Sequence, residues 1–292
     1  MQLLSPIHWK DYELIDSGSK EKLERFGEHT LIRPEPQALW NRSLPREEWE
    51  RMSNAVFRID KNDPEKGKWI LKHNVPEQWW INYSHSGMKL NFRLGLTAFR
   101  HIGIFPEQAV NWDFIYHFVR SGSFQQPKIL NLFAYTGGSS LAARAAGADV
   151  VHVDSVKPVI SWARENMEGS KLNDIRWVVE DAMKFVKREV RRGSKYQGII
   201  LDPPAYGRGA DGEKWVLDDQ INEMMMLCSN LLARKDSFLI LNMYSIGFSA
   251  LVADNLINSY FGNAREKELG ELFIADSYGK RLPLGTFLRI TC

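Results

Sequence analysis

Carboxylates and a glycine pair stand at one recurring place in this sequence, directly after short apolar runs. Gly137 and Gly138 follow the first run, and Asp154, Asp181 and Asp202 close the next three. An ionised carboxylate only accepts hydrogen bonds, so it suits a ligand that offers hydroxyl or amino groups. Glycines let a backbone turn tightly and approach a ligand closely. The pattern predicts a site that binds a molecule carrying hydroxyl and amino groups.

The glycine segment is NLFAYTGGSS (131–140). Two glycines before a helix let a ligand approach the free N–H groups of the helix N-terminus. Phe133 and Tyr135 interrupt the G-x-G-x-x-G spacing of dinucleotide-binding loops, and no Gly-Lys-Ser/Thr of a phosphate-binding loop follows. A plain tight turn between a strand and a helix is the alternative.

Two of the carboxylates suit different parts of a nucleoside. Asp154 could accept both hydroxyls of a ribose, as acids at this strand end do in nucleoside-binding α/β folds. Asp181, which precedes Ala182, could accept from an exocyclic amino group such as that of adenine. The alternative for each is a helix N-cap, which Asp154, Ser155 or Asp181 could provide.

The last of these carboxylates opens DPPAYGRGADGEKW (202–215). Pro203 and Pro204 remove two backbone donors, so that with Asp202 they form an acceptor-only cluster suited to an amino group or a positive centre. The glycines that follow predict a mobile loop. A simple turn at the end of the strand is the alternative. However, independent caps and turns would not be expected to follow successive apolar runs so regularly, and this order favours a site.

Regular alternation of strand and helix must position these residues. The predicted strands are 129–133, 150–154, 175–181, 196–202, 237–244 and 287–291. The predicted helices are 110–121, 139–148, 157–168, 182–193, 217–234 and 248–260. Such alternation predicts a doubly wound parallel sheet, in which ligands bind beyond the carboxyl ends of the strands.

The first hundred residues have a different character. They hold six of the ten tryptophans: Trp9, Trp40, Trp49, Trp69, Trp79 and Trp80. Alternating runs at 56–59, 69–75 and 79–83 are separated by turn signals, and 44–52 predicts a helix with Pro45 just inside its start. We predict a small antiparallel β subdomain. Its tryptophans could form an aromatic core or offer stacking faces to a ligand.

Composition excludes several classes of protein. The chain has 292 residues, is 44% hydrophobic and 25% charged, and carries a net charge of +2, which excludes a wholly disordered chain. It has no apolar run long enough to span a bilayer and no secretory signal. With only two cysteines, it predicts neither a disulfide framework nor a cysteine-based zinc site, and no His, Cys and acid grouping has metal-ligand spacing. We expect a cytoplasmic protein without a metal.

One segment is more basic than the rest. Residues 42–100 hold 11 Lys or Arg and 7 Asp or Glu, a net charge of +4. Such a patch could contact phosphates, or it could be an ordinary solvated surface.

The residues from 129 to 215 together resemble class I S-adenosylmethionine-dependent methyltransferases. More narrowly, they resemble the family that includes bacterial large-subunit ribosomal RNA methyltransferases, and FRHIGIFPEQAVNWDFI (99–115) is similar to the segment that precedes the first strand in that family. The resemblance implies a Rossmann-like α/β fold, with a seven-stranded, mostly parallel sheet whose last strand is reversed. It would occupy residues 99–292, with a β-rich subdomain at 1–98.

The resemblance also implies roles for individual residues. The residues that would contact S-adenosylmethionine are Phe105, Gln108, Phe133, Ala134, Tyr135, Thr136, Gly137, Asp154, Ser155, Asp181, Ala182 and Asp202. The residues that would face the methyl acceptor are Asp202, Pro203 and Pro204. Independently of the resemblance, Tyr206 could stack on a target base, or it could anchor the core or the loop. Arg208 and Lys214 could contact phosphate or solvent.

One departure from the family bears on the chemistry. Cytosine-5 methylation needs a thiolate that adds to the ring, yet Ala205 follows the two prolines and no cysteine occurs at 241–247. Cys228 lies in a predicted helix and is expected in the core, and Cys292 ends the chain. We therefore predict methyl transfer to a nitrogen of an RNA base, within ribosomal RNA. The alternatives are a protein or small-molecule acceptor, or a non-catalytic RNA-binding or assembly factor.

Overall fold

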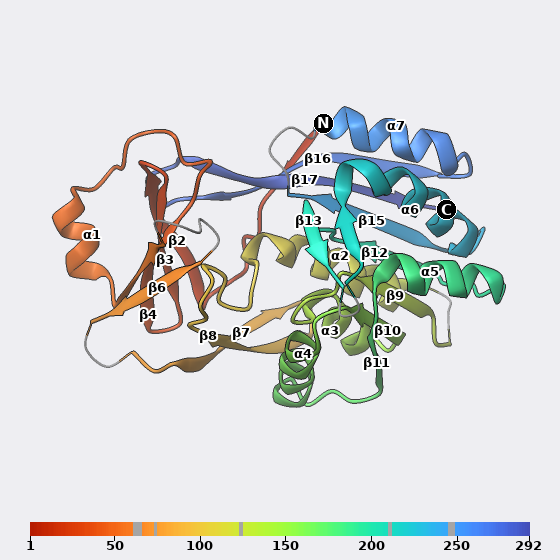
Figure 1. Cartoon of the computed structure of the whole chain (residues 1–292), viewed down its shortest axis with the longest axis horizontal. Coiled ribbons are helices and arrows are strands. Elements are labelled where there is room, and N and C mark those ends of the chain that lie inside the picture. Colours follow the sequence, from red (N-terminus) through yellow and green to blue (C-terminus); the bar gives the residue numbers. More distant parts are fainter. Residues whose placement is uncertain (61–65, 73–74, 123–124, 210–211, 245–248) are drawn as a thin grey trace. The chain divides into compact units, whose positions relative to one another are not determined.

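A computed structural model describes residues 1–60, 66–72, 75–122, 125–209, 212–244 and 249–292 (Figure 1). Parts of the turn segments between the strands expected at 56–59, 69–75 and 79–83, of the loop after Asp202 and of 241–247 therefore lie outside the described residues. The chain divides into two compact units. Unit 1 comprises Met1–Leu4, Gln108–Leu272 and Leu284–Cys292, and unit 2 comprises Ser5–Glu107 and Phe273–Pro283. These bounds differ from a division after residue 98, because 99–107 and 273–283 group with the N-terminal residues.

Unit 1 is built on an eight-stranded sheet. In spatial order its strands are β1 (Gln2–Leu4), β16 (Glu266–Ala275), β17 (Arg281–Thr291), β15 (Phe238–Met243), β12 (Gly198–Leu201), β9 (Lys128–Leu132), β10 (Asp149–Asp154) and β11 (Ile175–Val179). The strands from β15 to β11 are parallel, and β17 runs antiparallel to β15. The predicted fold class and the reversed last strand are confirmed. The sheet has one strand more than expected, because residues 2–4 pair with β16.

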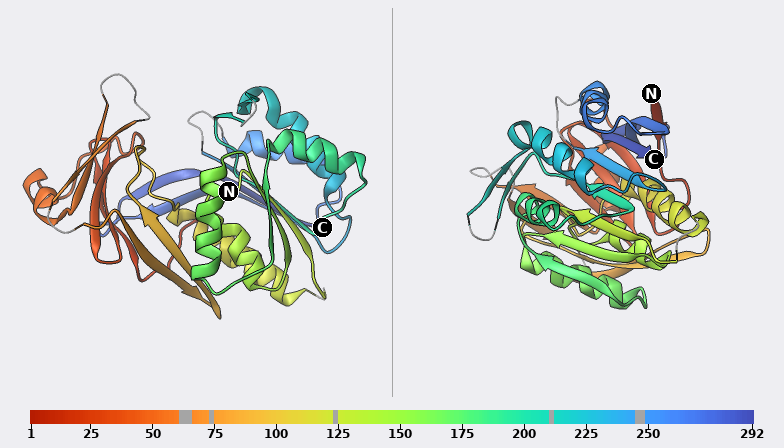
Figure 2. Two further views of the ribbon diagram at one scale, coloured as in Figure 1. Left: turned by 60° about the horizontal axis from the view of Figure 1, so that its bottom comes forward. Right: turned by 90° about the vertical axis from the view of Figure 1, so that its right-hand side faces the viewer.

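Helices cover both faces of this sheet (Figure 2). The group on one face is α2 (Ala109–Ser121), α3 (Gly138–Ala145) and α4 (Lys157–Gly169), which follow the short 3-10 turn at Pro106–Gln108. The group on the other face is α5 (Ala182–Arg191), α6 (Leu217–Leu231) and α7 (Ala250–Tyr260). Among the helices that the structure describes, none combines the length and apolar character needed to cross a membrane.

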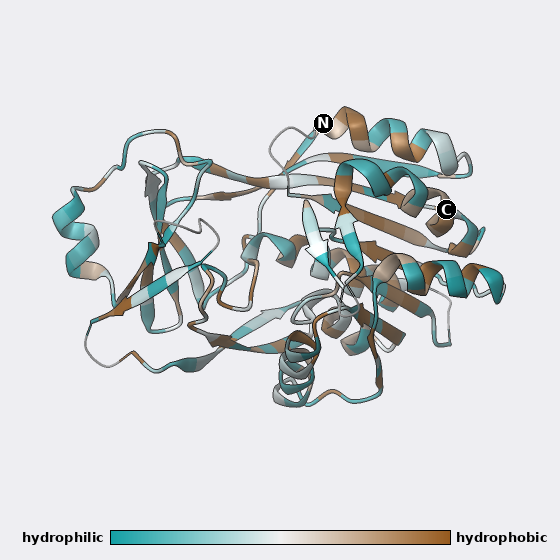
Figure 3. Cartoon of the chain, in the orientation of Figure 1, coloured by the Kyte–Doolittle hydropathy of each residue, from teal (hydrophilic) through white to brown (hydrophobic). Residues whose placement is uncertain are grey.

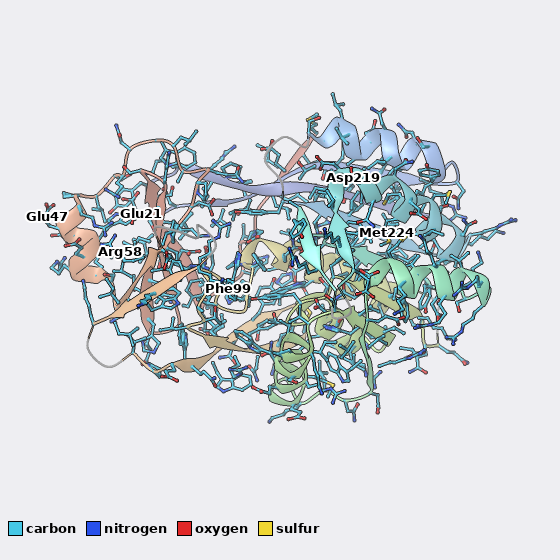
Figure 4. The ribbon with its side chains drawn as sticks, viewed as in Figure 1. Glu21, Glu47, Arg58, Phe99, Asp219 and Met224 are labelled. Atoms are coloured by element: carbon cyan, nitrogen blue, oxygen red, sulfur yellow. The ribbon has the colours of Figure 1, made fainter. Side chains whose placement is uncertain are left out.

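Burial explains why these segments fold as they do. Every residue of β12 and β15 is buried, which requires the continuous apolar runs seen as brown strands in Figure 3. The helices are two-sided: in α6, for example, Met224 is buried against the sheet while Asp219 is exposed (Figure 4). A doubly wound sheet needs this combination of fully apolar strands and amphipathic helices.

Unit 2 contains a five-stranded sheet, a separate hairpin and one helix. The sheet strands are β2 (Tyr12–Gly18), β3 (Glu21–Phe26), β4 (His29–Pro34), β5 (Ala55–Ile59) and β6 (Gly67–Leu71), in that order. The hairpin pairs β7 (Gln78–His85) with β8 (Met88–Gly95), and the helix is α1 (Arg46–Met52). Pro45 is the N-cap of α1 rather than its first residue. The expected strands at 56–59, 69–75 and 79–83 correspond to β5, β6 and β7.

Strands β2 to β4 contain buried charged residues, which interrupt the alternation of apolar and polar residues that predicts a strand. Asp16 is fully buried and accepts hydrogen bonds from the backbone N–H of Leu44, the indole of Trp49 and the Nζ of Lys280, at 2.9, 2.9 and 2.6 Å. Burial alone would raise the pKa of Asp16, but the bonds from Lys280, Leu44 and Trp49 hold it below its usual value. Lys280 also explains why residues 273–283 group with unit 2.

Candidate functional site

Three of the predicted site residues of unit 1 lie in one row at the carboxyl end of its parallel strands. Register places Val153, Leu132, Leu201 and Leu241 side by side on four adjacent strands. The next residue on each strand is therefore part of the same edge: Asp154, Phe133, Asp202 and Asn242. This edge is where open α/β sheets bind ligands.

The segment after β9 has an unusual backbone. Phe133, Tyr135 and Gly137 have φ of 55°, 48° and 92°, so three alternate residues lie in the left-handed region. A bulky residue rarely adopts this conformation, and its strain is characteristic of ligand-binding segments. The N–H groups of Ala134, Tyr135 and Gly137 bond within the protein, to the Val153 carbonyl, the Asp154 carboxylate and the Ala134 carbonyl. These internal hydrogen bonds hold the turn.

Neighbouring groups hold this strained segment in place. The N–H of Ala134 donates to the carbonyl of Val153 at 3.1 Å, and the buried Asn166 donates to the carbonyl of Thr136 at 3.0 Å. His152 packs beneath Gly137, fully buried, and a Cβ on Gly137 would lie 3.6 Å from its ring. Burial lowers the pKa of His152 to about 3, so its imidazole is neutral and forms part of the core.

Gly138 serves packing rather than ligand approach. A Cβ at this position would lie 2.5 Å from the indole of Trp112 on α2. The expectation that both glycines leave room for a ligand therefore holds at most for Gly137, because a tryptophan fills the space over Gly138.

We expect Gly138→Ala to destabilise unit 1 by about 1–3 kcal/mol, since the added methyl group must displace the Trp112 ring. Thermal and urea denaturation of the purified variant measure this loss. Gly262→Ala is the matched control, because a Cβ there meets nothing within 4 Å. Equal stability of the two variants would contradict the close packing of α2 on α3.

Asp154 joins the end of β10 to the strained segment. Its Oδ2 accepts from the N–H of Tyr135 and its Oδ1 from the N–H of Val156, both at 2.9 Å. It does not cap α4, whose N-cap is Val156. Burial raises the pKa of Asp154, and the bonds from Val156 and Tyr135 offset part of that rise. Each carboxylate oxygen keeps a lone pair for a hydroxyl donor, which fits the two ribose hydroxyls of a nucleoside.

The structure places Asp181 as the N-cap of α5. Its carboxylate accepts from the N–H of Lys184 at 2.9 Å, so the capping alternative is confirmed. The neighbouring Glu180 pairs with Arg188 instead. Ala182 is buried at the first position of the helix. Adenine recognition by Asp181 would use its second oxygen, and that role stays a prediction.

Asp202 differs from the other two acids because its carboxylate is not committed. The structure shows no hydrogen bond to it from any described residue, and burial alone raises its pKa to about 6. Pro203 is buried beside it. The acceptor-only cluster is smaller than expected, since the carbonyl of Pro204 accepts the indole N–H of Trp215 at 2.7 Å.

The segment after Pro204 forms a hairpin where a mobile loop was expected. Strands β13 (Tyr206–Arg208) and β14 (Lys214–Val216) pair antiparallel, although 210–211 lie outside the described residues. Trp215 is buried on one face of the hairpin, with its ring 4.7 Å from that of Phe133. Tyr206, Arg208 and Lys214 are exposed on the other face, and the Arg208 Nε donates to the Tyr206 hydroxyl at 3.0 Å.

A buried amide network at the same edge was missed by sequence reasoning. Asn111 on α2 and Asn242 on β15 both donate to the Oε1 of Gln108, at 2.7 and 3.2 Å, and Asn111 donates to the Oδ1 of Asn242 at 3.0 Å. Arg289 donates to the Oδ1 of Asn111 at 2.9 Å. Because two donors occupy its oxygen, Gln108 presents its amide N–H groups elsewhere. The signal was an asparagine in each of two buried positions, one inside the otherwise apolar strand β15 and one near the start of α2.

The remaining predicted residues contribute less in this structure. Phe105 belongs to unit 2, where its ring lies 5.2 Å from that of His101, and its role at the cofactor stays a prediction. Ser155 follows Asp154 and is half-buried. Outside the undescribed gaps, no three or more His, Cys, Asp or Glu side chains are grouped to hold a metal ion.

Comparison with known proteins agrees with this geometry. Residues 56–260 match the family model described as S-adenosylmethionine-dependent methyltransferase. The crystal structure of a SAM-dependent methyltransferase from Agrobacterium tumefaciens is similar over 100% of this chain and 93% of that one, with 39% identity and a TM-score of 0.91. Another solved structure, of a protein complexed with SAH, has a TM-score of 0.74 over 98% of this chain and 76% of its own, but at 17% identity it shows the fold alone.

Curated relatives match over shorter segments. Ribosomal RNA large subunit methyltransferase I of Escherichia coli is 34% identical over 85 residues, which are 28% of this chain and 22% of that protein. Ribosomal RNA large subunit methyltransferase K/L of Shewanella frigidimarina is 28% identical over 138 residues, 46% of this chain and 18% of that protein. The matched segments thus span about a fifth of the length of these two relatives.

Proposed function

The chain belongs to the S-adenosylmethionine-dependent methyltransferase family, and we propose that it methylates a nitrogen of a base in ribosomal RNA. The names of the curated relatives support ribosomal RNA as the acceptor. Action on ribosomal RNA would place the protein in the cytoplasm, as its composition predicts.

The residues at the sheet edge fit the methyl donor. Asp154 would accept from the ribose hydroxyls, the backbone of 133–137 would hold the methionine end, and Asp181 with Ala182 would border the adenine. S-adenosylmethionine supplies a methyl group on a positively charged sulfur, and the sulfur–carbon bond breaks as the new bond to the acceptor forms. The chain's own contribution is to position both reactants in line and to exclude water.

The carboxylate of Asp202 is the feature that supports a nitrogen atom as the methyl acceptor. Its carboxylate lies in the row of site residues with no hydrogen bond from the described protein. We propose that it accepts an N–H of the target base, which directs the nitrogen lone pair toward the methyl carbon. As the N–C bond forms, the electron pair of the S–C bond returns to sulfur, and the displaced N–H proton passes to Asp202 or water.

The cysteines support direct transfer rather than attack through a thiolate. Cys228 is fully buried in α6 and Cys292 is buried at the end of β17, and these are the chain's two cysteines. Burial raises the pKa of both thiols, which disfavours the nucleophilic form. A cytosine-5 mechanism would therefore lack its nucleophile.

The exposed face of the β13–β14 hairpin suits the target nucleotide. Tyr206 is 52% exposed and lies three residues after Pro203 in the sequence, so its ring could stack on a base. Arg208 orients the ring through the tyrosine hydroxyl, and Lys214 lies opposite Arg208 in the pairing.

We expect Tyr206→Ala to raise KM for RNA about tenfold, since base stacking on an aromatic ring contributes about 1–3 kcal/mol. Affinity for S-adenosylmethionine, measured by calorimetry, should not change. Tyr206→Phe is the matched control, because it keeps the ring and removes only the hydroxyl that Arg208 binds. A KM unchanged in both variants would remove Tyr206 from the acceptor site.

Transfer of radiolabelled methyl from S-adenosylmethionine tests the proposed function directly. The acceptors to compare are unmodified ribosomal RNA, total cell protein and a small-molecule extract, followed by mass spectrometry of digested RNA. We expect label in one base of ribosomal RNA, on nitrogen. Label in protein or in a small molecule would show that RNA is not the acceptor. Label on a base carbon would contradict the nitrogen target. Binding of S-adenosylmethionine without methyl transfer would favour a non-catalytic RNA-binding factor.

A further inference from the structure

The amide groups of Gln108, Asn111 and Asn242 take their orientation from one arginine. A guanidinium donates hydrogen bonds and accepts none, so the atom of Asn111 that lies 2.9 Å from the Nε of Arg289 is its oxygen. The Nδ2 of Asn111 must then donate, to the Oε1 of Gln108 at 2.7 Å and to the Oδ1 of Asn242 at 3.0 Å. It follows that Gln108 presents its N–H groups, and not its oxygen, to a ligand.

The arginine that sets this direction is itself held firmly. Arg289 is buried on β17, with its guanidinium 4.9 Å from the ring of Phe114 and 5.1 Å from the ring of Phe287. Asn111 and Asn242 are buried as well. Buried amides cannot exchange their partners for water, and turning one of them over would leave buried polar atoms unpaired. The direction of these hydrogen bonds is therefore fixed by the fold.

Gln108 stands at the open end of this chain of hydrogen bonds. Its side chain is half-buried on the 3-10 turn before α2, and no group among the described residues accepts from its Nε2. The Nε2 atom is not sealed in the interior, so a ligand can reach it. Gln108 thus offers a donor of fixed orientation to an oxygen or nitrogen acceptor.

Asn242 brings this donor close to Asp202. Leu201 and Leu241 are neighbours in the pairing of β12 with β15, and both belong to the apolar cluster that contains residues of α5 and α6. Alternation turns the next residue of each strand, Asp202 and Asn242, to the opposite face, which α2 covers. Adjacent strands lie about 4.8 Å apart. The Gln108 amide, which accepts from Asn242 at 3.2 Å, can therefore contact the same small group as the Asp202 carboxylate.

A carboxylate acceptor beside an amide donor matches the –NH–C(=O)– edge of a lactam. Guanine offers this edge at N1 and O6, and uracil offers it at N3 and O4. A lactam nitrogen is a poor nucleophile while it keeps its proton, because its lone pair is delocalised onto the carbonyl. When a base removes the proton, negative charge develops on the carbonyl oxygen, where an N–H donor stabilises it. An exocyclic amino group develops positive charge instead, so a donor beside it would not assist its methylation.

We propose that the methyl acceptor is the lactam nitrogen of a guanine or uracil in RNA. Asp202 takes the N–H proton, the nitrogen lone pair forms the bond to the methyl carbon, and the electron pair of the S–C bond returns to sulfur. Gln108 donates to the adjacent carbonyl oxygen during this step, and Arg289 positions Gln108 through Asn111. The positive charge of the sulfonium is cancelled by the charge that Asp202 loses on protonation, and both products are neutral at the reacting atoms.

This assignment rests on the proposed function, which it narrows from any base nitrogen to one chemical class. It also gives the amide of Gln108 to the methyl acceptor, whereas the family resemblance implies contact with S-adenosylmethionine. The two roles predict different effects of substitution, because a cofactor contact changes the affinity for S-adenosylmethionine and an acceptor contact changes the rate of transfer.

Mass spectrometry of nucleosides from ribosomal RNA methylated by the full chain tests the target atom. We expect the methyl group on N1 of guanine or on N3 of uracil. A methyl group on an exocyclic amino nitrogen would overturn the lactam assignment and leave the proposed function standing. Absence of any transfer to RNA would reject both.

Gln108→Glu tests the donor at the same site. The variant keeps an oxygen for Asn111 and Asn242 and replaces the N–H groups by a second oxygen. We expect kcat to fall about 10²–10³-fold, as when one donor is removed from an oxyanion site, while the Kd for S-adenosylmethionine in calorimetry changes little. Gln78→Glu, the same change at an exposed glutamine of β7, is the control for added charge. A loss of cofactor affinity with kcat retained would return Gln108 to the cofactor and overturn its assignment to the acceptor.

Arg289 is tested by its coupling to Gln108. Arg289→Met removes the donor that orients Asn111, whereas Arg289→Lys keeps a donor, so we expect methionine to lower kcat and lysine to restore much of it. Combined with Gln108→Glu, Arg289→Met should add little further loss, because both act through one amide. Losses that multiply, or that follow the melting temperature of the variants, would show that Arg289 only stabilises the fold and would reject its positioning role. Should Arg289→Met not fold, the comparison of Arg289→Lys with wild type, alone and with Gln108→Glu, decides the same point.

Discussion

Asp202→Asn is expected to lower methyl transfer about a hundredfold while making the folded protein more stable. The loss of activity follows from the proposed contact, because an amide accepts an N–H bond less strongly than a carboxylate and cannot take the proton, and general-base assistance contributes about 10²–10⁴-fold. Affinity for S-adenosylmethionine should change much less than the rate. Activity and stability thus move in opposite directions at one position.

The gain in stability follows from the raised pKa of Asp202. In the unfolded chain this carboxyl ionises near its ordinary pKa of 3.8, whereas in the folded protein burial raises its pKa to about 6. The folded state therefore binds the proton more tightly, and the cost of ionising Asp202 grows as pH rises from about 4 to 6 and is complete above 6. At neutral pH the asparagine variant avoids this cost, which is about 1–3 kcal/mol.

The pH dependence of both quantities distinguishes this explanation from a simple packing effect. Wild-type activity should rise with pH through about 6, as Asp202 ionises, and this limb should be absent from the residual activity of the variant. Melting temperatures of the two proteins should converge as pH falls toward 4. Asp219→Asn, which removes an exposed carboxylate of α6, is the control and should alter neither quantity beyond its small effect on the helix. A melting temperature that is higher for Asp202→Asn by the same amount at every pH would contradict the assignment.

The sequence predicted unit 1 more completely than unit 2, and burial explains why. Strands such as β12 and β15 are buried on both faces, so they had to appear as continuous apolar runs. Strands β2 to β4 instead bury Asp16, Glu24 and Arg33, and Arg33 donates to Glu24 at 2.9 Å. A buried charged residue interrupts the apolar pattern by which a strand is predicted. The partner that allows its burial is identified only once the fold is known.

The candidate site shows the same limit. Asp154 and Asp202 end strands, and a parallel sheet brings strand ends together, so their proximity could be predicted from topology alone. Trp215 and Asn242 could not be predicted in this way. Trp215 reaches the site only because the segment after Pro204 folds back as a hairpin, and Asn242 matters through Asn111, which is 131 residues away. The sequence also does not distinguish Asp154 and Asp181, which accept hydrogen bonds from backbone N–H groups, from Asp202, which accepts none among the described residues.

Asp154→Ala is the second change with a large expected effect, and it acts on the cofactor rather than on the chemistry. The substitution removes both proposed ribose contacts and also the bonds from Tyr135 and Val156 that tie the strained segment to β10. We expect affinity for S-adenosylmethionine to fall by about 2 kcal/mol or more, which is about thirtyfold in Kd. Isothermal titration calorimetry measures this directly, and S-adenosylhomocysteine should lose a similar factor because it carries the same ribose.

Asp154→Asn separates the two roles of the carboxylate. The amide can still accept one backbone bond, so the segment from 133 to 137 should keep more of its conformation, while one of the two hydroxyl acceptors becomes a donor. We therefore expect an intermediate affinity, with a melting temperature closer to wild type than that of the alanine variant. If alanine weakens binding and lowers stability while asparagine does neither, Asp154 acts mainly on the backbone of the segment. Unchanged affinity in both folded variants would show that the ribose does not bind at the end of β10. The proposed orientation of S-adenosylmethionine along this edge of the sheet would then be wrong.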